Sequence, residues 1–132
     1  MKYAYVFEDK ANDNLQELRK LGEQYFKLYL KNSATISDSE RKKNEQTIKS
    51  LLQKMYKIMS SFGMKQSDMD KAIADTIKKV MKNYGISLMK FGGVDILRMD
   101  IDLDLDTIDK SWDKAYKDFG TKLAEYVMLY YI

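Results

Sequence analysis

The sequence predicts an α+β domain that is mainly helical, and three features of the chain indicate this class. Four segments repeat apolar residues every three or four positions, short segments alternate large and small or apolar and polar residues, and a glycine pair separates two of the short segments. With 45% apolar and 33% charged residues, the 132-residue chain has the composition of a folded protein, and a single domain over residues 1–132 is expected. The alternative is an all-α four-helix bundle.

The amino-terminal segment predicts a short strand followed by a helix. Residues 3–7 alternate aromatic and smaller side chains, which is typical of a strand. The helix is expected over residues 14–31, where Asn14 and Glu17 stand at the spacing of a helix cap. Its apolar face comprises Leu15, Leu18, Leu21, Tyr25, Leu28 and Tyr29.

A second helix is predicted over residues 38–60. Ser37 followed by Glu40 matches a capping box at its start, and Gly63 stands where a residue with positive φ commonly ends a helix. Its apolar stripe comprises Ile48, Leu51, Leu52, Met55, Met59 and Phe62. The methionines in this helix and the next are expected to fill the core.

A third helix is predicted over residues 68–84. Ser67 with Asp70 is its expected cap, and Gly85 is expected to end it. Its inward face comprises Met69, Ile73, Ile77, Val80, Met81 and Tyr84.

Two antiparallel strands are predicted next, over residues 86–90 and 94–105. Gly92 and Gly93 lie between them and suit the unusual backbone angles of a hairpin turn. In the second strand, apolar residues at alternate positions would face one way and aspartates the other, whereas a helix would scatter those aspartates around its circumference. Together with residues 3–7, these strands make up the predicted small sheet.

The fourth predicted helix spans residues 107–131. Gly120 is expected to loosen its middle, at a cost of about 1 kcal/mol relative to alanine. Its broad apolar face comprises Ile108, Trp112, Ala115, Tyr116, Phe119, Leu123, Tyr126, Val127 and Tyr130.

The residue types that are missing exclude several kinds of chemistry. Neither cysteine nor histidine occurs, so the chain lacks the commonest metal ligand, the thiol nucleophile and the commonest general base at neutral pH. No nucleotide-binding motif is present, and the longest apolar run has seven residues, far fewer than the roughly 20 that span a bilayer. We therefore expect a cytoplasmic protein that is not an enzyme and has no cofactor, no metal site and no membrane partner.

Acidic residues concentrate near the carboxyl end, where eight of fourteen aspartates fall between Asp95 and Asp118. The alternating aspartates do not match a calcium-binding loop, because Leu105 and Ser111 stand where glycine and glutamate are required. Identical solvated carboxylates also lack the contrasting environments that acid–base catalysis needs. Two interpretations remain, a strand edge protected by charge and a surface that docks onto a basic partner. The docking residues are predicted to be Asp95, Asp100, Asp102, Asp104, Asp106 and Asp109.

Basic residues concentrate in the middle, where residues 41–90 carry twelve Lys or Arg against four Asp or Glu. A lysine-rich helical face is either simply solvated or contacts nucleic-acid phosphates. The segment resembles a helix-turn-helix in layout, yet Asp68 and Asp70 at the start of the third helix disfavour contact with bases. The phosphate-contacting residues of this alternative are Lys42, Lys49, Lys57, Lys71, Lys78, Lys79 and Lys82.

The last seven residues are apolar on every side, so they are either buried all round or continue into a partner. Tyrosine is enriched at protein interfaces. An interface in a homodimer is therefore the second interpretation of this end, with the residues Tyr126, Leu129, Tyr130 and Tyr131.

Taken together, these patterns predict a non-enzymatic protein-binding module that docks through its acidic surface. Twenty lysines against three arginines, with no proline, suggest an AT-rich coding sequence such as that of a phage or mobile element. An anti-CRISPR-type inhibitor of a host nucleic-acid-acting or defence complex is a concrete version, and its partner would be a host protein or protein–nucleic-acid complex with a basic groove. The alternative is a nucleic-acid-binding or virion structural protein that uses the lysine-rich face.

Overall fold

The computed structural model describes residues 2–34, 37–91, 94–98 and 112–131, with side chains described at 13–33, 37–86 and 112–131. The described elements are α1 (Lys2–Ala34), α2 (Asp38–Ser61), α3 (Gln66–Asn83), β1 (Ser87–Phe91), β2 (Val94–Arg98) and α5 (Asp113–Tyr131). The predicted mainly helical class is confirmed. None of the helices in the described part is long and apolar enough to cross a membrane.

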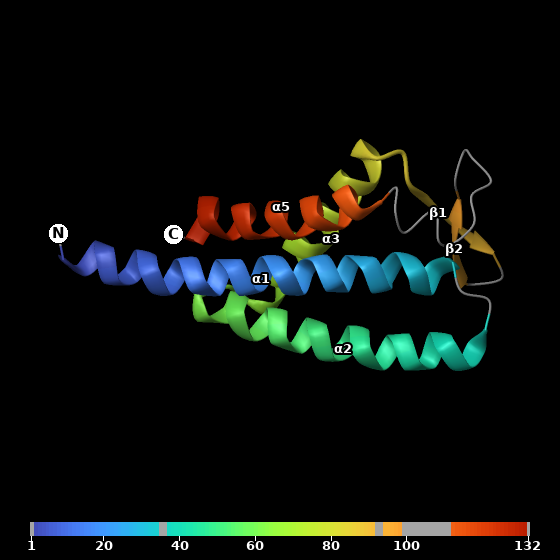
Figure 1. Cartoon of the computed structure of the whole chain (residues 1–132), viewed down its shortest axis with the longest axis horizontal. Helices are drawn as coiled ribbons and strands as arrows, with labels where there is room; N and C mark the ends of the chain where they lie inside the picture. Colours follow the sequence, from blue (N-terminus) through green and yellow to red (C-terminus); the bar gives the residue numbers. More distant parts are fainter. Residues whose placement is uncertain (1, 35–36, 92–93, 99–111, 132) are drawn as a thin grey trace.

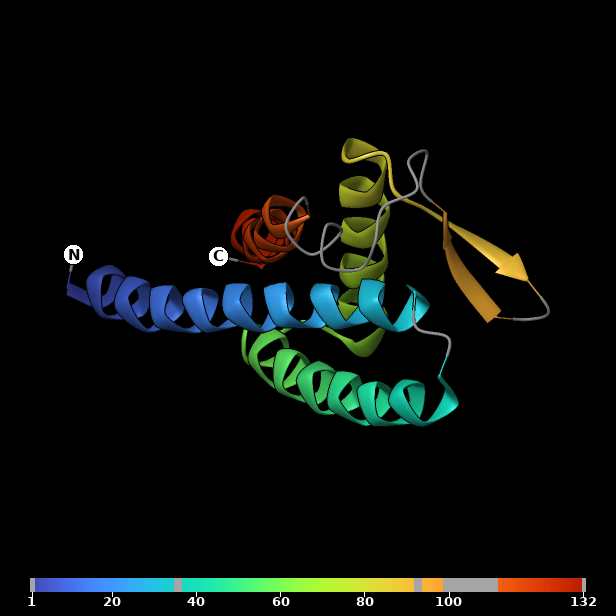
Figure 2. The same cartoon turned by 45° about the vertical axis from the view of Figure 1, so that its right-hand side comes forward.

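Helix α1 lies at the centre of the bundle, with α2 along one side and α5 along the other (Figure 1). Both neighbours run antiparallel to α1, and α5 crosses it obliquely. Helix α3 packs against α5 and meets α2 near the turn that joins them. The β1–β2 hairpin projects from the end of the bundle where α1 ends (Figure 2).

The hairpin is a two-stranded antiparallel pair in which Ser87 lies opposite Arg98 and Lys90 lies opposite Asp95. Its strands overlap the segments predicted as strands at 86–90 and 94–105, and β1 extends one residue beyond the first of them, to Phe91. Residues 99–105 and the predicted turn at Gly92 and Gly93 lie outside the described residues.

The predicted strand at residues 3–7 is wrong, because these residues belong to the first turns of α1. An alternation of five residues is too short to exclude a helix. No glycine or proline stands between Lys2 and Leu21, so the strong helical pattern that follows extends back through the segment. Asn14, the predicted cap, therefore lies inside α1, and the small sheet does not include the amino-terminal segment.

The other helix boundaries differ less from prediction. Helix α2 begins at the predicted residue, with Ser37 at the cap position, although the Ser37 side chain makes no capping hydrogen bond. Helix α3 begins two residues early, so Lys65 rather than Ser67 occupies its cap position. Helix α5 is described from Asp113, and the earlier part of its predicted range, 107–111, lies outside the described residues.

The core is one apolar cluster contributed by α1, α2, α3 and α5, with Met55 and Met59 of α2 fully buried. Helix α1 buries more than its predicted face, because neighbours cover it on two sides: Phe26 and Leu30 are buried although the predicted stripe omitted them. The predicted inward orientation is wrong for Tyr84 and Tyr130, which lie at the ends of their helices and are 37% and 70% exposed.

Helices α1 and α5 make a close backbone contact at Gly22 and Gly120. A Cβ atom added at Gly22 would lie 3.1 Å from Cα of Gly120, and one added at Gly120 would overlap the carbonyl oxygen of Arg19. The expectation that Gly120 loosens α5 is therefore replaced by a different role: the missing side chain lets the two helices approach. Around this contact, the rings of Phe26 and Phe119 stack with centroids 4.7 Å apart and an interplanar angle of 5°.

We expect Gly120→Ala to destabilise the protein by about 1–3 kcal/mol, because the added methyl group must push α1 and α5 apart. Helix propensity alone predicts the opposite sign, a gain of about 1 kcal/mol. Urea unfolding followed by circular dichroism measures the difference. Gly22→Ala is the matched comparison. It should lower the free energy of unfolding by less, since its Cβ would lie 3.1 Å from Cα of Gly120. A Gly120→Ala protein as stable as wild type would contradict the close contact.

Candidate functional site

The three lysines predicted on the second helix lie on the exposed side of α2. Lys42, Lys49 and Lys57 are all exposed, whereas Leu51 and Met55 on the other side of the helix are buried. This follows from the amphipathic pattern, because the apolar stripe fixes which side faces α1.

Helix α3 has the same arrangement. Lys71, Lys78, Lys79 and Lys82 are exposed, and the opposite side of the helix is buried. Within the described part of the chain, none of the seven predicted lysines forms an ion pair. The fold therefore leaves these ammonium groups available to a ligand.

Sequence reasoning missed two lysines of the same α2 surface. Lys43 and Lys54 are also exposed, on the side of α2 away from the core. A signal for them was present, because the stretch from Gln46 to Ser67 contains no Asp or Glu. An acid-free stretch that continues through a whole helix places like charges on every exposed part of it.

The two aspartates at the start of α3 tie this helix to its neighbours. The Tyr56 hydroxyl of α2 donates a 2.7 Å hydrogen bond to Oδ1 of Asp70, and Nε2 of Gln66 donates to the same oxygen at 3.0 Å. Burial, followed by the bond and charge of Asp70, raises the pKa of Tyr56 to about 12. Two residues earlier, Asp68 lies near Tyr131, and partial desolvation followed by the negative charge of Asp68 raises the pKa of Tyr131.

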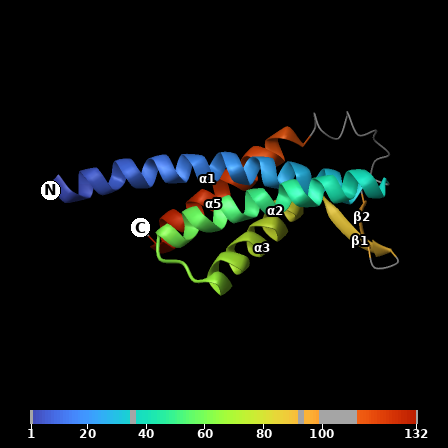
Figure 3. The same ribbon diagram turned by 90° about the horizontal axis from the view of Figure 1, so that it is seen from below.

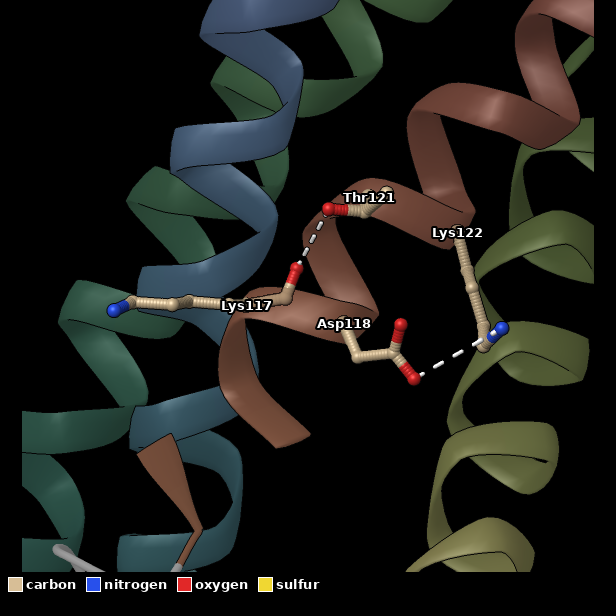
Figure 4. Close-up of polar contacts among 4 residues, drawn as sticks. All are labelled: Lys117, Asp118, Thr121 and Lys122. Carbon is tan, nitrogen blue, oxygen red and sulfur yellow. Dashed lines mark hydrogen bonds and ion pairs between the residues drawn. The ribbon is translucent and has the colours of Figure 1, made fainter. Parts of the chain in front are cut away.

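A third tyrosine–aspartate pair, Tyr84 and Asp118, lies at the other end of α3. Desolvation followed by the negative charge of Asp118 raises the pKa of Tyr84. Asp118 also lies 3.9 Å from Nζ of Lys122, on the side of α5 next to α3 (Figure 4). Helix α3 is therefore bonded to α2 at its start through Asp70, and it packs against α5.

These pairs bear on the helix-turn-helix comparison. In such motifs the first residues of the second helix contact bases. In this fold Asp70 is instead bonded to Tyr56 of α2, and α3 packs against α5 and α2. The α2–turn–α3 segment, with Gly63 at a φ of 89°, thus serves to build the bundle.

The predicted acidic docking residues are mostly outside the described part of the structure. Asp95 lies in β2, opposite Lys90 in the backbone register. The other five, Asp100, Asp102, Asp104, Asp106 and Asp109, fall in residues 99–111. Among the described residues, no three acidic side chains come together as a candidate metal site.

The carboxyl-terminal turns of α5 have both buried and exposed apolar residues. Val127 is fully buried, but Met128, Leu129 and Tyr130 are 49%, 75% and 70% exposed. The rings of Tyr126 and Tyr130 lie 4.8 Å apart between centroids. Of the four residues predicted at an oligomer interface, Leu129 and Tyr130 are thus the exposed pair, while Tyr126 and Tyr131 are partly buried.

Comparison with known proteins gives no match to a protein family, to a curated protein or to a solved structure.

We expect Tyr56→Phe to lower the free energy of unfolding at neutral pH by about 0.5–1.5 kcal/mol, through loss of the bond to Asp70. The folded protein holds the Tyr56 proton up to a pKa of about 12, whereas the unfolded chain releases it near 10. The contribution of this tyrosine is therefore fully present below pH 10 and declines as the pH rises from about 10 to about 12. Tyr56→Phe should remove part of that alkaline decline.

Thermal unfolding across alkaline pH measures this effect. The matched control is Tyr130→Phe, which removes a hydroxyl from a ring that is 70% exposed and should leave neutral-pH stability unchanged. Equal alkaline declines in wild type and Tyr56→Phe would rule out the proposed contribution of the Tyr56–Asp70 pair.

Proposed function

We propose that this chain is a non-enzymatic binding module that docks onto a basic protein surface. The docking element is the acidic strand, the strand predicted over residues 94–105 with its alternating aspartates. The observation that carries the proposal is the division of charge along the chain: residues 41–90 have a net charge of +8, and residues 91–132 have nine acids against five bases. The lysines of α2 and α3 make no ion pairs within the described residues, which supports a folded protein that keeps its positive charge apart from the acidic segment.

The position of the hairpin supports the same proposal. The acidic segment begins in β2, and the hairpin projects from the end of the bundle (Figure 2). A projecting strand can enter a groove on a partner that the wide helical bundle cannot enter. If the alternation continues through residues 100–106, successive carboxylates stand about 6.6–6.8 Å apart on one face.

A groove that normally holds nucleic acid has the complementary charge. Carboxylates in such a groove take the place of phosphates, and the attraction raises the association rate and fixes the orientation of the complex. The concrete form of the proposal is an inhibitor of a host nucleic-acid-acting or defence complex, of the anti-CRISPR type, encoded by a phage or mobile element. Its lysine-rich, proline-free composition supports that source.

Substitution of Asp100, Asp102, Asp104 and Asp106 by Asn tests the proposal. We expect the association rate with the partner, first captured from host lysate on immobilised wild-type protein, to fall about tenfold or more at low salt. The salt dependence of binding should become weaker as well. Surface plasmon resonance across a salt series measures both quantities.

The matched control changes the net charge by the same amount elsewhere. It carries the substitutions Glu40→Gln, Glu45→Gln, Asp75→Asn and Glu125→Gln, all at exposed positions of the helices. This control should bind as wild type does. If the Asp-to-Asn variant also bound as wild type does, the acidic strand would not be the docking surface.

A further inference from the structure

The outer side of α2 is the most uniformly basic surface among the described residues. Its lysines, here called the α2 lysine face, are Lys42, Lys43, Lys49, Lys54 and Lys57. All five are exposed, so no described element covers them, and none pairs with an acid in the described part of the chain. Helix α2 lies at the edge of the bundle, with α1 and α3 on its other sides (Figures 1 and 3).

The charge of α2 distinguishes it from α3. Residues 41–61 carry one arginine and five lysines against Glu45, a net charge of +5. Residues 66–83 carry four lysines against three aspartates, a net charge of +1. Apart from Glu45, the exposed residues that separate the α2 lysines are neutral and polar, as at Gln46, Ser50 and Gln53. A polyanion would therefore meet little repulsion along α2 and considerably more along α3.

The length of the face suits a repeating anion. Lys42 and Lys57 are fifteen residues apart, which corresponds to about 22 Å along a helix that rises 1.5 Å per residue. One strand of a DNA duplex places a phosphate about every 3.4 Å along the axis, so the face runs beside roughly six phosphates. Flexible, compact ammonium groups spread over that length can contact several phosphates at once.

We propose that the α2 lysine face binds the phosphate backbone of duplex DNA without recognising its sequence. The face has no arginine to pair with base edges, so it lacks the commonest means of reading sequence. It also has no aromatic ring on which free bases could stack, which favours a duplex over a single strand. The nearest aromatic side chain, Tyr56, is partly buried and bonded to Asp70 of α3. Binding through α2 is independent of the acidic residues 95–109, which are a separate segment of the sequence and have the opposite charge.

Fluorescence anisotropy with a labelled duplex of mixed sequence, across a salt series, tests the proposal. Contacts to four or five phosphates predict a slope of about −4 for log K against log salt. In the variant with Lys42, Lys49, Lys54 and Lys57 changed to Gln, we expect the slope to approach zero. A second duplex of unrelated sequence should bind wild type with the same affinity.

The chain offers a matched control on α3. Changing Lys71, Lys78, Lys79 and Lys82 to Gln removes the same charge from exposed positions of a neighbouring helix, and this protein should keep a slope close to that of wild type. Circular dichroism establishes that both variants are folded. Since all eight side chains are exposed, neither variant should lose helicity.

Three results would overturn the proposal. The first is no duplex binding by wild type at low salt, and the second is equal loss in the α2 and α3 variants, which indicates an effect of net charge alone. The third is tighter binding to single-stranded DNA or to anionic phospholipid vesicles than to the duplex. None of these results depends on the aspartate substitutions, so the docking function of the acidic strand stands or fails separately.

Discussion

The close contact of Gly22 and Gly120 is the constraint on which the rest of the bundle depends. Neither residue has a side chain, so the backbones of α1 and α5 approach until a Cβ atom at Gly120 would overlap the carbonyl oxygen of Arg19. This approach brings Phe119 against Phe26, with ring centroids 4.7 Å apart. It also sets the position of α5, and α5 in turn packs against α3.

The parts of the fold that the sequence predicted are those determined by local periodicity. Helices α2 and α3 each bury one side, so a stripe at helical spacing located them to within about two residues. Helix α1 departs from this pattern because α2 and α5 cover it on two sides, and its burial of Phe26 follows from the packing of distant segments. The strand at 3–7 was wrongly predicted for a different reason: a short alternation carries less information than the long helical pattern next to it.

The candidate site also has a part that the sequence could predict and a part that it could not. The exposed lysines could be predicted, because an apolar stripe fixes the opposite side of a helix. The contacts of Asp68 and Asp70 could not be predicted, since Tyr131, which lies near Asp68, and Tyr56, which is bonded to Asp70, are on other helices. From the sequence, these acids only disfavoured contact with bases. In the fold, Asp70 bonds α3 to Tyr56 of α2.

The distribution of charge among the helices separates the α2 lysine face from an ordinary solvated surface. On α5, acids and lysines alternate four residues apart, as in the 3.0 Å pair of Asp113 with Lys117. Such pairs stabilise a helix by about 0.2–0.5 kcal/mol, and like charges at that spacing destabilise it by a similar amount. A surface that serves only solubility carries positive and negative side chains interspersed. Helix α2 instead has no acid after Glu45, so it gives up this local stabilisation over most of its length, which is expected of a surface whose counterions belong to a ligand.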